Sequence, residues 1–366
     1  MKRVLRYIKL YGFQRTFVKV LGRLRLNLPL WIILFFPNFN RTGKKVVIIG
    51  CGHHAYSSVA FYLSKYTNSK IIGVYYTNKH AAESLAKAYN SKFIPINEML
   101  NSSDFLPDIA YICTNHASHT DIGKKFLEKG CDVFIEKPIS VNTEQIIQLS
   151  NFFENNKCQK LYVGYNRPFS PAIKKIKTLT HNKKNPFILS SFIVGHHIKE
   201  DHWYRNEDEG TRVLSNLSHW IDLTVNMLYN KKSNLDFIDI SITYSYEDDY
   251  DKNFNEPFVI NLVSSNNDIS IITFTGREEP YEGVNETISF QQDDIFAKID
   301  DYRTMSIWKG DSFKKYRFWP KNNGHRSCII QPFKANMRPW VESQLTAKLT
   351  IFIDEMAKNH AFHKKF

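Results

Sequence analysis

Cysteine is scarce in this sequence of 366 residues: there are five, an odd number, and no two stand in a CxxC pair. This usage excludes the disulfide framework that stabilises small secreted domains. We therefore expect free thiols and a cytoplasmic protein.

The sequence also lacks an apolar run long enough to cross a bilayer, which takes about 20 residues. The best candidate, residues 28–36, is broken by Pro29 and followed by Pro37. Residues 1–42 instead form a basic, amphipathic N-terminal extension, whose charges are Lys2, Arg3, Arg6, Lys9, Arg15, Lys19, Arg23 and Arg25. Two interpretations remain: the extension packs on the protein, or it makes a peripheral contact with the inner membrane face.

No nucleic-acid-binding motif accompanies the formal net charge of +13, and Lys and Arg are spread along the whole chain. This pattern favours a solvated basic surface and no nucleic-acid partner. His196, His197 and His202 lie close in sequence, but no Cys or acidic cluster stands at ligand spacing around them. We expect no metal site.

Residues 43–166 alternate between short β-branched runs and segments with helical spacing. The expected strands are 45–49, 71–75, 109–113, 132–135 and 160–163. Strands that alternate with helices through short connections predict a doubly wound parallel sheet, a Rossmann domain of the α/β class.

The pattern changes in residues 167–366. A helix is expected at 212–228, strands at 187–194, 237–246, 258–264, 269–275, 286–291, 295–300 and 304–309, and a closing helix at 340–358. Successive strands separated by turn residues predict an α+β domain with an open, mainly antiparallel sheet. An open sheet face often pairs with a second subunit, so we expect a homo-oligomer.

Gly50-x-Gly52-x-x-Ala55 follows the first strand and opens a helix. In a dinucleotide site the first Gly makes the turn, the second lets the pyrophosphate approach, and the third position needs a small side chain. The free N–H groups of the helix then bind the phosphates. His53 and His54 in this loop either bind phosphate or are ordinary loop residues.

The second strand ends in Tyr75-Tyr76-Thr77-Asn78-Lys79, without the acid that holds the adenosine ribose in an NAD site. Without that acid nothing repels a 2′-phosphate, and Thr77 and Asn78 are candidate cofactor ligands. The sequence therefore predicts NAD or NADP as cofactor and leaves the choice open.

Glu136-Lys137-Pro138 follows the fourth strand, at the sheet edge where a nicotinamide ring would lie. Oxidation of a C–OH group needs a base for the hydroxyl proton, and a lysine whose pKa is lowered by burial suits this role. The alternative is a surface lysine at a strand end. We expect Lys137 to be catalytic.

Four segments together resemble the Gfo/Idh/MocA oxidoreductases, which include glucose–fructose oxidoreductase and inositol dehydrogenase. They are the glycine turn, Thr114-Asn115-His116-Ala117-Ser118-His119, Glu136-Lys137-Pro138 and Gly164-Tyr165-Asn166-Arg167. Later segments, among them Asn323-Gly324-His325-Arg326, are similar to the branch found in bacterial surface-polysaccharide pathways. The resemblance implies that Lys137 is the acid–base, that Glu136 lies beside the cofactor and that the Lys137–Pro138 bond is cis. It also places Thr114, Asn115, His116 and His119 at the loop under the nicotinamide.

The resemblance implies a second catalytic group, His219, but the acid that the family often places four residues earlier is Ser215 here. Asn216 is the candidate to replace part of its role. The remaining candidate substrate ligands lie in loops or at the start of the helix: Tyr165, Arg167, Trp203, Tyr204 and Arg212. The two arginines suit a phosphate or carboxylate, which guanidinium binds bidentately.

These observations predict an NAD(P)-dependent oxidoreductase of a carbohydrate C–OH group, acting on a nucleotide-linked sugar in surface-polysaccharide synthesis. The alternative is a catalytically silent NAD(P)-binding sensor or partner protein in a glycan pathway, which Ser215 and the basic extension favour.

Overall fold

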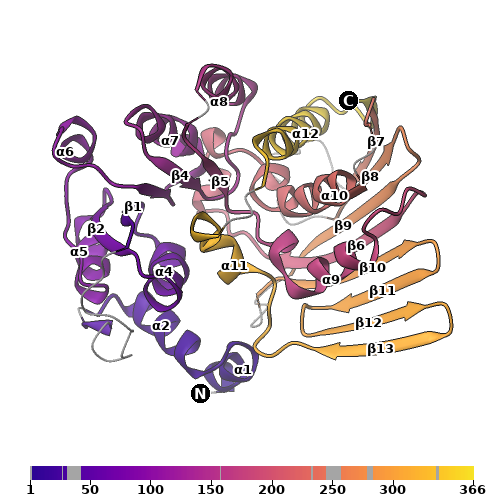
Figure 1. Cartoon of the computed structure of the whole chain (residues 1–366), viewed down its shortest axis with the longest axis horizontal. Coiled ribbons are helices and arrows are strands. Elements are labelled where there is room, and N and C mark those ends of the chain that lie inside the picture. Colours follow the sequence, from indigo (N-terminus) through magenta and orange to yellow (C-terminus); the bar gives the residue numbers. More distant parts are fainter. Residues whose placement is uncertain are drawn as a thin grey trace. The chain divides into compact units, whose positions relative to one another are not determined.

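The computed structural model describes residues 2–26, 28–30, 43–156, 158–231, 234–244, 257–277, 283–334 and 338–366. The chain forms two compact units (Figure 1). We call residues 12–165 with 325–340 the Rossmann unit, and residues 1–11, 166–324 and 341–366 the sheet unit. Residues 325–340 therefore belong to the Rossmann unit, although they follow the expected domain boundary at residue 166.

The Rossmann unit contains the expected parallel sheet. Its strands lie in the order β2 (Lys70–Tyr75), β1 (Lys45–Ile49), β3 (Ile109–Ile112), β4 (Asp132–Ile135) and β5 (Leu161–Val163). Strands β1, β3, β4 and β5 are almost wholly buried, which is typical of a parallel sheet covered by crossover helices. The helices are α4 (Ala60–Tyr66), preceded by a π-helical turn at Ala55–Val59, then α5 (Lys79–Ala88), α6 (Ile96–Asn101), α7 (His119–Glu128) and α8 (Thr143–Asn155).

Residues 325–340 are held to this sheet by hydrogen bonds at two strands. Tyr111 of β3 donates its hydroxyl to the carbonyl of Ile329 at 2.6 Å. Gln331 Nε2 donates to the carbonyl of Val163 in β5 at 3.1 Å. These bonds fix the short helix α11 (His325–Ile329) within the Rossmann unit.

The sheet unit is built on nine described strands, of which only the β6–β9 pair is parallel. Their order is β13 (Ser312–Arg317), β12 (Thr304–Lys309), β11 (Ile295–Asp300), β10 (Asn285–Gln292), β6 (Ile188–His196), β9 (Ile269–Arg277), β8 (Phe258–Ser264), β7 (Ile238–Tyr244) and β14 (His363–Lys365). This confirms the open, mainly antiparallel sheet. Residues 245–246, the expected end of one strand, lie outside the described residues.

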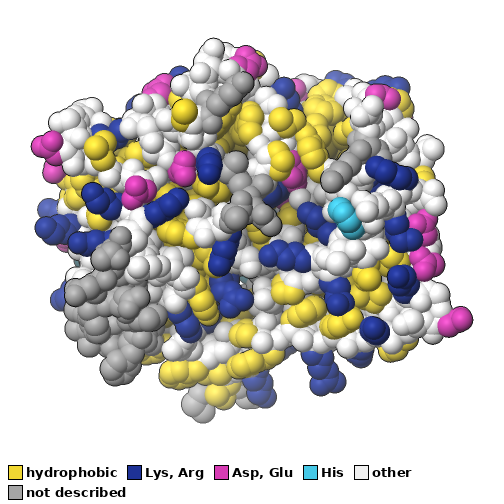
Figure 2. Space-filling model, in the orientation of Figure 1, with side chains coloured by type: hydrophobic (Ala, Val, Ile, Leu, Met, Phe, Trp, Pro, Cys, Tyr) yellow, Lys and Arg dark blue, Asp and Glu magenta, His cyan; other side chains and the backbone are white. Residues whose placement is uncertain are grey.

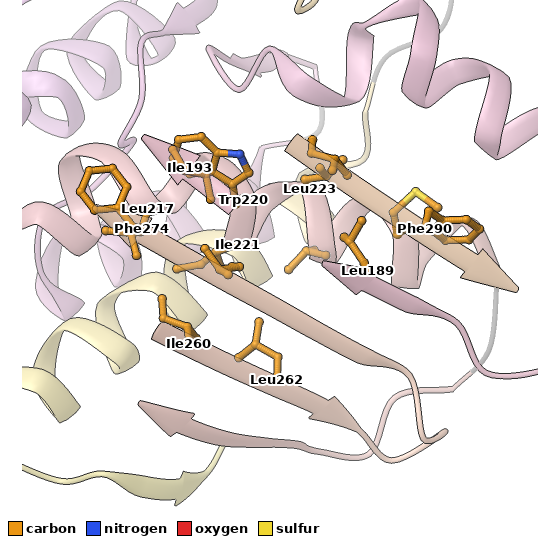
Figure 3. Close-up of a cluster of buried hydrophobic side chains, with 14 of the residues drawn as sticks. Leu189, Ile193, Leu217, Trp220, Ile221, Leu223, Ile260, Leu262, Phe274 and Phe290 are labelled. Atoms are coloured by element: carbon orange, nitrogen blue, oxygen red, sulfur yellow. The ribbon is translucent and has the colours of Figure 1, made fainter. Parts of the chain in front are cut away.

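One face of this sheet carries the core of the unit. The helices of the unit are α9 (Pro171–Leu179), α10 (Ser218–Lys231) and α12 (Trp340–Lys358). Figure 3 shows side chains of the α10 region packed against strands: Leu217, Trp220, Ile221 and Leu223 opposite Leu189, Ile193, Ile260, Leu262, Phe274 and Phe290. The alternating burial of the strands follows from their period-2 apolar pattern.

The described part of the N-terminal extension packs on the protein. Helix α1 (Lys2–Tyr11) belongs to the sheet unit. The carbonyl of its Lys9 accepts a hydrogen bond from Trp319 Nε1 at 2.8 Å. Helix α2 (Phe13–Leu24) lies in the Rossmann unit and buries Val18 and Leu21. Among the described residues no helix is long and apolar enough to span a membrane. The expected apolar run 28–36 lies mostly outside the described residues.

Basic side chains are scattered among apolar and uncharged ones on the face drawn in Figure 2.

Candidate cofactor and active site

The turn after β1 has the geometry that a dinucleotide pyrophosphate needs. Gly50 has φ +90°, and a Cβ there would lie 2.4 Å from the carbonyl oxygen of Cys113. A Cβ at Gly52 would meet no heavy atom within 4 Å, so space is open beside this glycine. The helix then begins with Tyr56 N–H donating to the Gly52 carbonyl at 3.1 Å. The residues present thus fit a dinucleotide: a tight turn, open space and a helix N-terminus.

Glu136 and Lys137 lie at the carboxyl end of β4, in the same unit as this turn. The Glu136 N–H donates to the Ile112 carbonyl at 2.9 Å, which continues the β3–β4 pairing past the end of β4. Lys137 is half-buried, and the bond between Lys137 and Pro138 is cis, as expected.

Glu136 connects this strand end to the glycine loop. Its Oε1 lies 3.1 Å from His54 Nε2, and a Cβ at Gly164 would lie 2.6 Å from its Oε2. Burial raises the pKa of Glu136, but the charge and hydrogen bond of His54 and the charge of Lys137 outweigh burial and hold it below its usual range. Glu136 is therefore a carboxylate at neutral pH, held between the loop and β5.

His119 has a positioning role beneath this segment. Its Nδ1 lies 2.7 Å from the Pro138 carbonyl and its Nε2 lies 3.0 Å from the Thr114 carbonyl. The ring is buried, and burial lowers its pKa. His119 thus joins the loop after β3 to the segment after Lys137. Thr114 Oγ1 accepts a hydrogen bond from the Ser118 hydroxyl at 2.8 Å, and the Asn115 carbonyl accepts one from the Ser118 N–H at 3.2 Å. His116 is buried beside His119.

In the segment after β2, Asn78 has a structural role in addition to the cofactor contact that the sequence suggests. Asn78 caps α5 by accepting a hydrogen bond from Ala81 N–H at 3.0 Å, while Thr77 is exposed. A basic residue of the extension, Arg25, reaches this region and donates to the carbonyl of Cys51 in the glycine loop at 2.6 Å. Sequence reasoning did not single out Arg25, because no local pattern shows where the extension folds back.

His53 and His54, which the sequence left undecided, have separate surroundings. His54 pairs with Glu136, and its ring lies 5.8 Å from that of His325 on α11. His53 lies against α2, with Nδ1 3.4 Å from the point where a Cβ of Gly22 would be. The segment containing His325 was noticed in the sequence, but His325 was not named as a site residue.

In the sheet unit Arg212 is a buried cation with spare donors. It is 5% exposed; its Nη2 donates to the His196 carbonyl at 2.6 Å, and its guanidinium lies 4.6 Å from the centre of the Phe274 ring. Its Nε and Nη1 are buried and find no hydrogen-bond partner among the described residues. Burial lowers the pKa of Arg212 to about 10, which leaves it charged at neutral pH.

The loop before Arg212 contributes aromatic rings to the same unit. Trp203 and Tyr204 lie edge to face with ring centres 4.4 Å apart, and the ring of His202 is 4.7 Å from that of Tyr204. Burial and the charge of Arg212 lower the pKa of His202. The ring of His202 in this loop therefore lies close enough to Arg212 to be affected by its charge.

The helical segment with His219 departs from the expected regular helix. Residues Val213–Leu217 form a π-helical turn, so Ser215 and His219 do not follow the 3.6-residue period that the i, i+4 expectation assumed. Ser215 is buried and its hydroxyl lies 3.3 Å from Asn216 Oδ1, while His219 is half-buried. Tyr165 is buried in the Rossmann unit.

Arg167 differs most from its expected role as a substrate ligand. It is 4% exposed and forms a two-point ion pair with Glu286, at 3.2 Å through Nε and 2.8 Å through Nη2. Nη1 donates to Asn166 Oδ1 at 2.8 Å. Because its three nitrogens all have partners inside the unit, we assign Arg167 a structural role.

No group of three or more His, Cys, Asp or Glu residues suited to a metal ion occurs in the described part of the chain.

Comparison with known proteins identifies the Rossmann unit most clearly. Residues 44–165 match the sequence model of the Gfo/Idh/MocA group, described as an oxidoreductase family with an NAD-binding Rossmann fold. This match confirms the expected class of cofactor, NAD(P).

Two curated relatives match parts of the chain. Inositol 2-dehydrogenase of Rhizobium meliloti is 32% identical over 97 residues, 26% of this chain. Glucose-6-phosphate 3-dehydrogenase of Bacillus subtilis is 28% identical over 148 residues, 40% of this chain. The matches span 28% and 41% of the relatives' own lengths.

A solved structure extends the likeness of fold beyond the Rossmann unit. UDP-N-acetylglucosamine 3-dehydrogenase GnnA from Acidithiobacillus ferrooxidans superposes with a TM-score of 0.66 at 16% identity. The superposition covers 85% of this chain and 97% of that protein. The two proteins therefore share a fold over most of this chain.

Proposed function

We propose that this chain, which belongs to the Gfo/Idh/MocA oxidoreductase family through residues 44–165, is an NAD(P)-dependent oxidoreductase acting on a carbohydrate C–OH group. The observation that carries the proposal is the placement of Glu136 and Lys137 at the carboxyl end of β4. In open α/β sheets ligands bind at the carboxyl ends of the strands. The His54–Glu136 contact of 3.1 Å ties this strand end to the loop suited to the pyrophosphate.

Lys137 is the group that moves the hydroxyl proton in this proposal. A bound nicotinamide supplies the hydride chemistry. The Lys137 amine accepts the proton of the substrate hydroxyl during oxidation and returns it during reduction. The backbone on either side of Lys137 is held by the Glu136 N–H bond to Ile112 and by the His119–Pro138 contact, which fixes the point from which the lysine side chain extends.

An anionic carbohydrate, such as a nucleotide-linked sugar, is the substrate class we favour. Arg212 carries a buried charge with two nitrogen atoms that lack partners among the described residues. A buried, unpaired donor costs about 1–3 kcal/mol, more for a charged group, and a phosphate or carboxylate would remove that cost. Relatives are named as dehydrogenases of inositol and of glucose 6-phosphate, and one protein of the same fold as a dehydrogenase of a UDP-sugar.

The proposal is tested by Lys137→Met, with Lys87→Met on the exposed face of α5 as a matched control. The purified variants are titrated with NADH and NADPH and assayed for cofactor reduction with inositol, sugar phosphates and UDP-, GDP- and dTDP-sugars. We expect Lys137→Met to bind cofactor like the wild type but to lose about 10²–10⁴-fold in kcat, the usual contribution of acid–base catalysis. Wild-type turnover by Lys137→Met would refute the role of Lys137, and cofactor binding without turnover by any form would favour the silent alternative.

Arg212→Leu tests the substrate class separately. If Arg212 binds the anionic part of the substrate, KM for a phosphorylated or nucleotide-linked sugar should rise by about tenfold or more. Turnover of a neutral polyol should change little. An equal loss for charged and neutral substrates would argue against an anion contact.

We further propose that the exposed face of the sheet mediates self-association. The strand register places Ile188, Gln291, Phe296, Trp308 and Phe313 in one row across β6, β10, β11, β12 and β13. The four apolar members are 37–54% exposed. Phe296, Trp308 and Phe313 are adjacent in this row, and neighbouring exposed apolar side chains are typical of a protein–protein contact.

A further inference from the structure

Helix α2 is docked on the first crossover helix of the Rossmann unit, next to the glycine loop. A Cβ at Gly22 would lie 2.7 Å from Cδ1 of Tyr56, so glycine at this position permits the close approach. Arg15 Nη2 donates to Ser58 Oγ at 2.5 Å on the same crossover helix. The α2 part of the extension is therefore built into the dinucleotide-binding unit.

Arg25 leaves the end of α2 and connects the two segments that border the adenosine ribose in a dinucleotide fold. Its φ of 51° turns the chain at the helix end. Nη2 donates to the Cys51 carbonyl in the glycine loop at 2.6 Å, and Nη1 lies 3.4 Å from the Ala81 carbonyl in the first turn of α5. Its guanidinium lies 5.4 Å from the centre of the Tyr56 ring. The ribose 2′-hydroxyl of NAD is bound at the end of β2, between these two segments.

The charge at this place is positive. Arg25 forms no ion pair with any described carboxylate; its hydrogen bonds go to backbone carbonyls. The segment after β2 supplies Thr77, Asn78 and Lys79 in place of the acid of an NAD site. A carboxylate there would favour a ribose hydroxyl and repel a phosphate, whereas a guanidinium favours the phosphate.

Further basic groups of α2 lie near the same loop. Burial, followed by the charges of Lys19, Arg23 and Arg25, lowers the pKa of His53 to about 4. Both ring nitrogens of His53 are buried without a hydrogen-bond partner among the described residues. Cations gathered beside a loop that binds phosphates are stabilised when an anion arrives.

We propose that Arg25 of the N-terminal extension binds the 2′-phosphate of NADP and makes this chain prefer NADP over NAD. The inference rests on the proposed function in that it takes the Rossmann unit to bind a nicotinamide dinucleotide. It gives the extension a role in coenzyme selection. It also explains why β2 ends without an acid.

The test is a set of equilibrium titrations of the full-length protein with NADPH, NADH, 2′,5′-ADP and 5′-ADP. The variants are Arg25→Leu, Arg25→Lys and, as control, Arg317→Leu, an exposed arginine on β13 of the other unit. We expect the wild type to bind NADPH and 2′,5′-ADP more tightly than NADH and 5′-ADP. Arg25→Leu should lose about tenfold or more in affinity for the 2′-phosphorylated ligands only. Arg25→Lys should lie between wild type and Arg25→Leu, and the control should match the wild type.

The outcomes separate this inference from the proposed function. Equal losses for NADPH and NADH in both Arg25 variants would mean that Arg25 only holds the loop, and the inference would be wrong. Wild-type preference for NADH would also overturn it while leaving the oxidoreductase proposal intact. Failure to bind either dinucleotide would overturn both. Thermal unfolding of each variant checks that the loop region remains folded.

Discussion

The buried ion pair between Arg167 and Glu286 gives a sharp test of the assignment of Arg167 to the interior. Glu286 is fully buried and accepts hydrogen bonds from Arg167 and from Trp220 Nε1, the latter at 2.9 Å. The Arg167 guanidinium also lies 4.7 Å from the centre of the Trp220 ring. Arg167→Met would remove the cation and leave the carboxylate buried with one neutral donor.

The expected cost follows from that unpaired charge. Removal of one partner from a buried ion pair destabilises a protein by about 3–5 kcal/mol, because the remaining charge has lost its compensation. The double variant Arg167→Met/Glu286→Leu removes both charges. It leaves the indole N–H without its acceptor and, like the single variant, leaves Asn166 Oδ1 without the donor that Arg167 supplied. It should therefore recover part of the loss, since an unpaired neutral group costs about 1–3 kcal/mol, less than an uncompensated buried charge.

Urea-induced unfolding, followed by tryptophan fluorescence and circular dichroism, measures both variants against the wild type. The double-mutant cycle should give a large coupling between the two positions, because they are in direct contact. If Arg167→Met unfolded like the wild type but raised KM for a phosphorylated substrate, the structural assignment would be wrong and the ligand role expected from the sequence would stand.

Three further predictions concern other parts of the chain. Gly52→Ala should unfold like the wild type, because its Cβ meets nothing within 4 Å. It should weaken dinucleotide binding about tenfold or more, because the methyl group fills the space for the phosphates. Gly50→Ala should lose stability as well, because its Cβ would lie 2.4 Å from a carbonyl oxygen. Trp308→Glu should shift the protein toward the monomer in analytical ultracentrifugation, and Leu106→Glu, at a more exposed apolar residue of the Rossmann unit, should not. Burial and two neighbouring arginines lower the pKa of Lys19 to about 7, so the folded state disfavours its charge and stability should rise with pH between about 7 and 10. Lys19→Met should accordingly be more stable than the wild type near pH 7, by an amount that shrinks toward pH 10 in urea titrations; a pH-independent difference would contradict the shift.

The sequence predicted the strands best where one face is buried. β8, β11 and β12 have the expected bounds: they are apolar runs in which the structure buries alternate residues, so that one face packs on the core. β13 was missed: Ser312–Arg317 is almost wholly exposed and its polar residues show no alternation. β14 is three exposed residues whose strand conformation depends on pairing with β7.

The site was predictable where function depends on a local turn and not where it depends on long-range packing. Gly50 and Glu136 are identified by their position after a strand, a signal contained in a few residues. The partner of Arg167 lies on β10, and nothing near Arg167 in the sequence indicates Glu286. The π-helical turn at Val213–Leu217 was equally invisible, since its apolar residues also fit a regular helix.

The end of β2 shows how a missing motif residue is best interpreted. Judged locally, the absence of the acid removes the repulsion of a 2′-phosphate, and Thr77 and Asn78 become the candidate ligands. In the fold, Asn78 is occupied as the cap of α5, and a cation arrives from a segment that precedes the first strand. A carboxylate at the end of β2 would lie near Arg25 and compete with any phosphate for it. The absence of the acid and the presence of Arg25 therefore belong to one electrostatic arrangement, suited to an anion at the ribose.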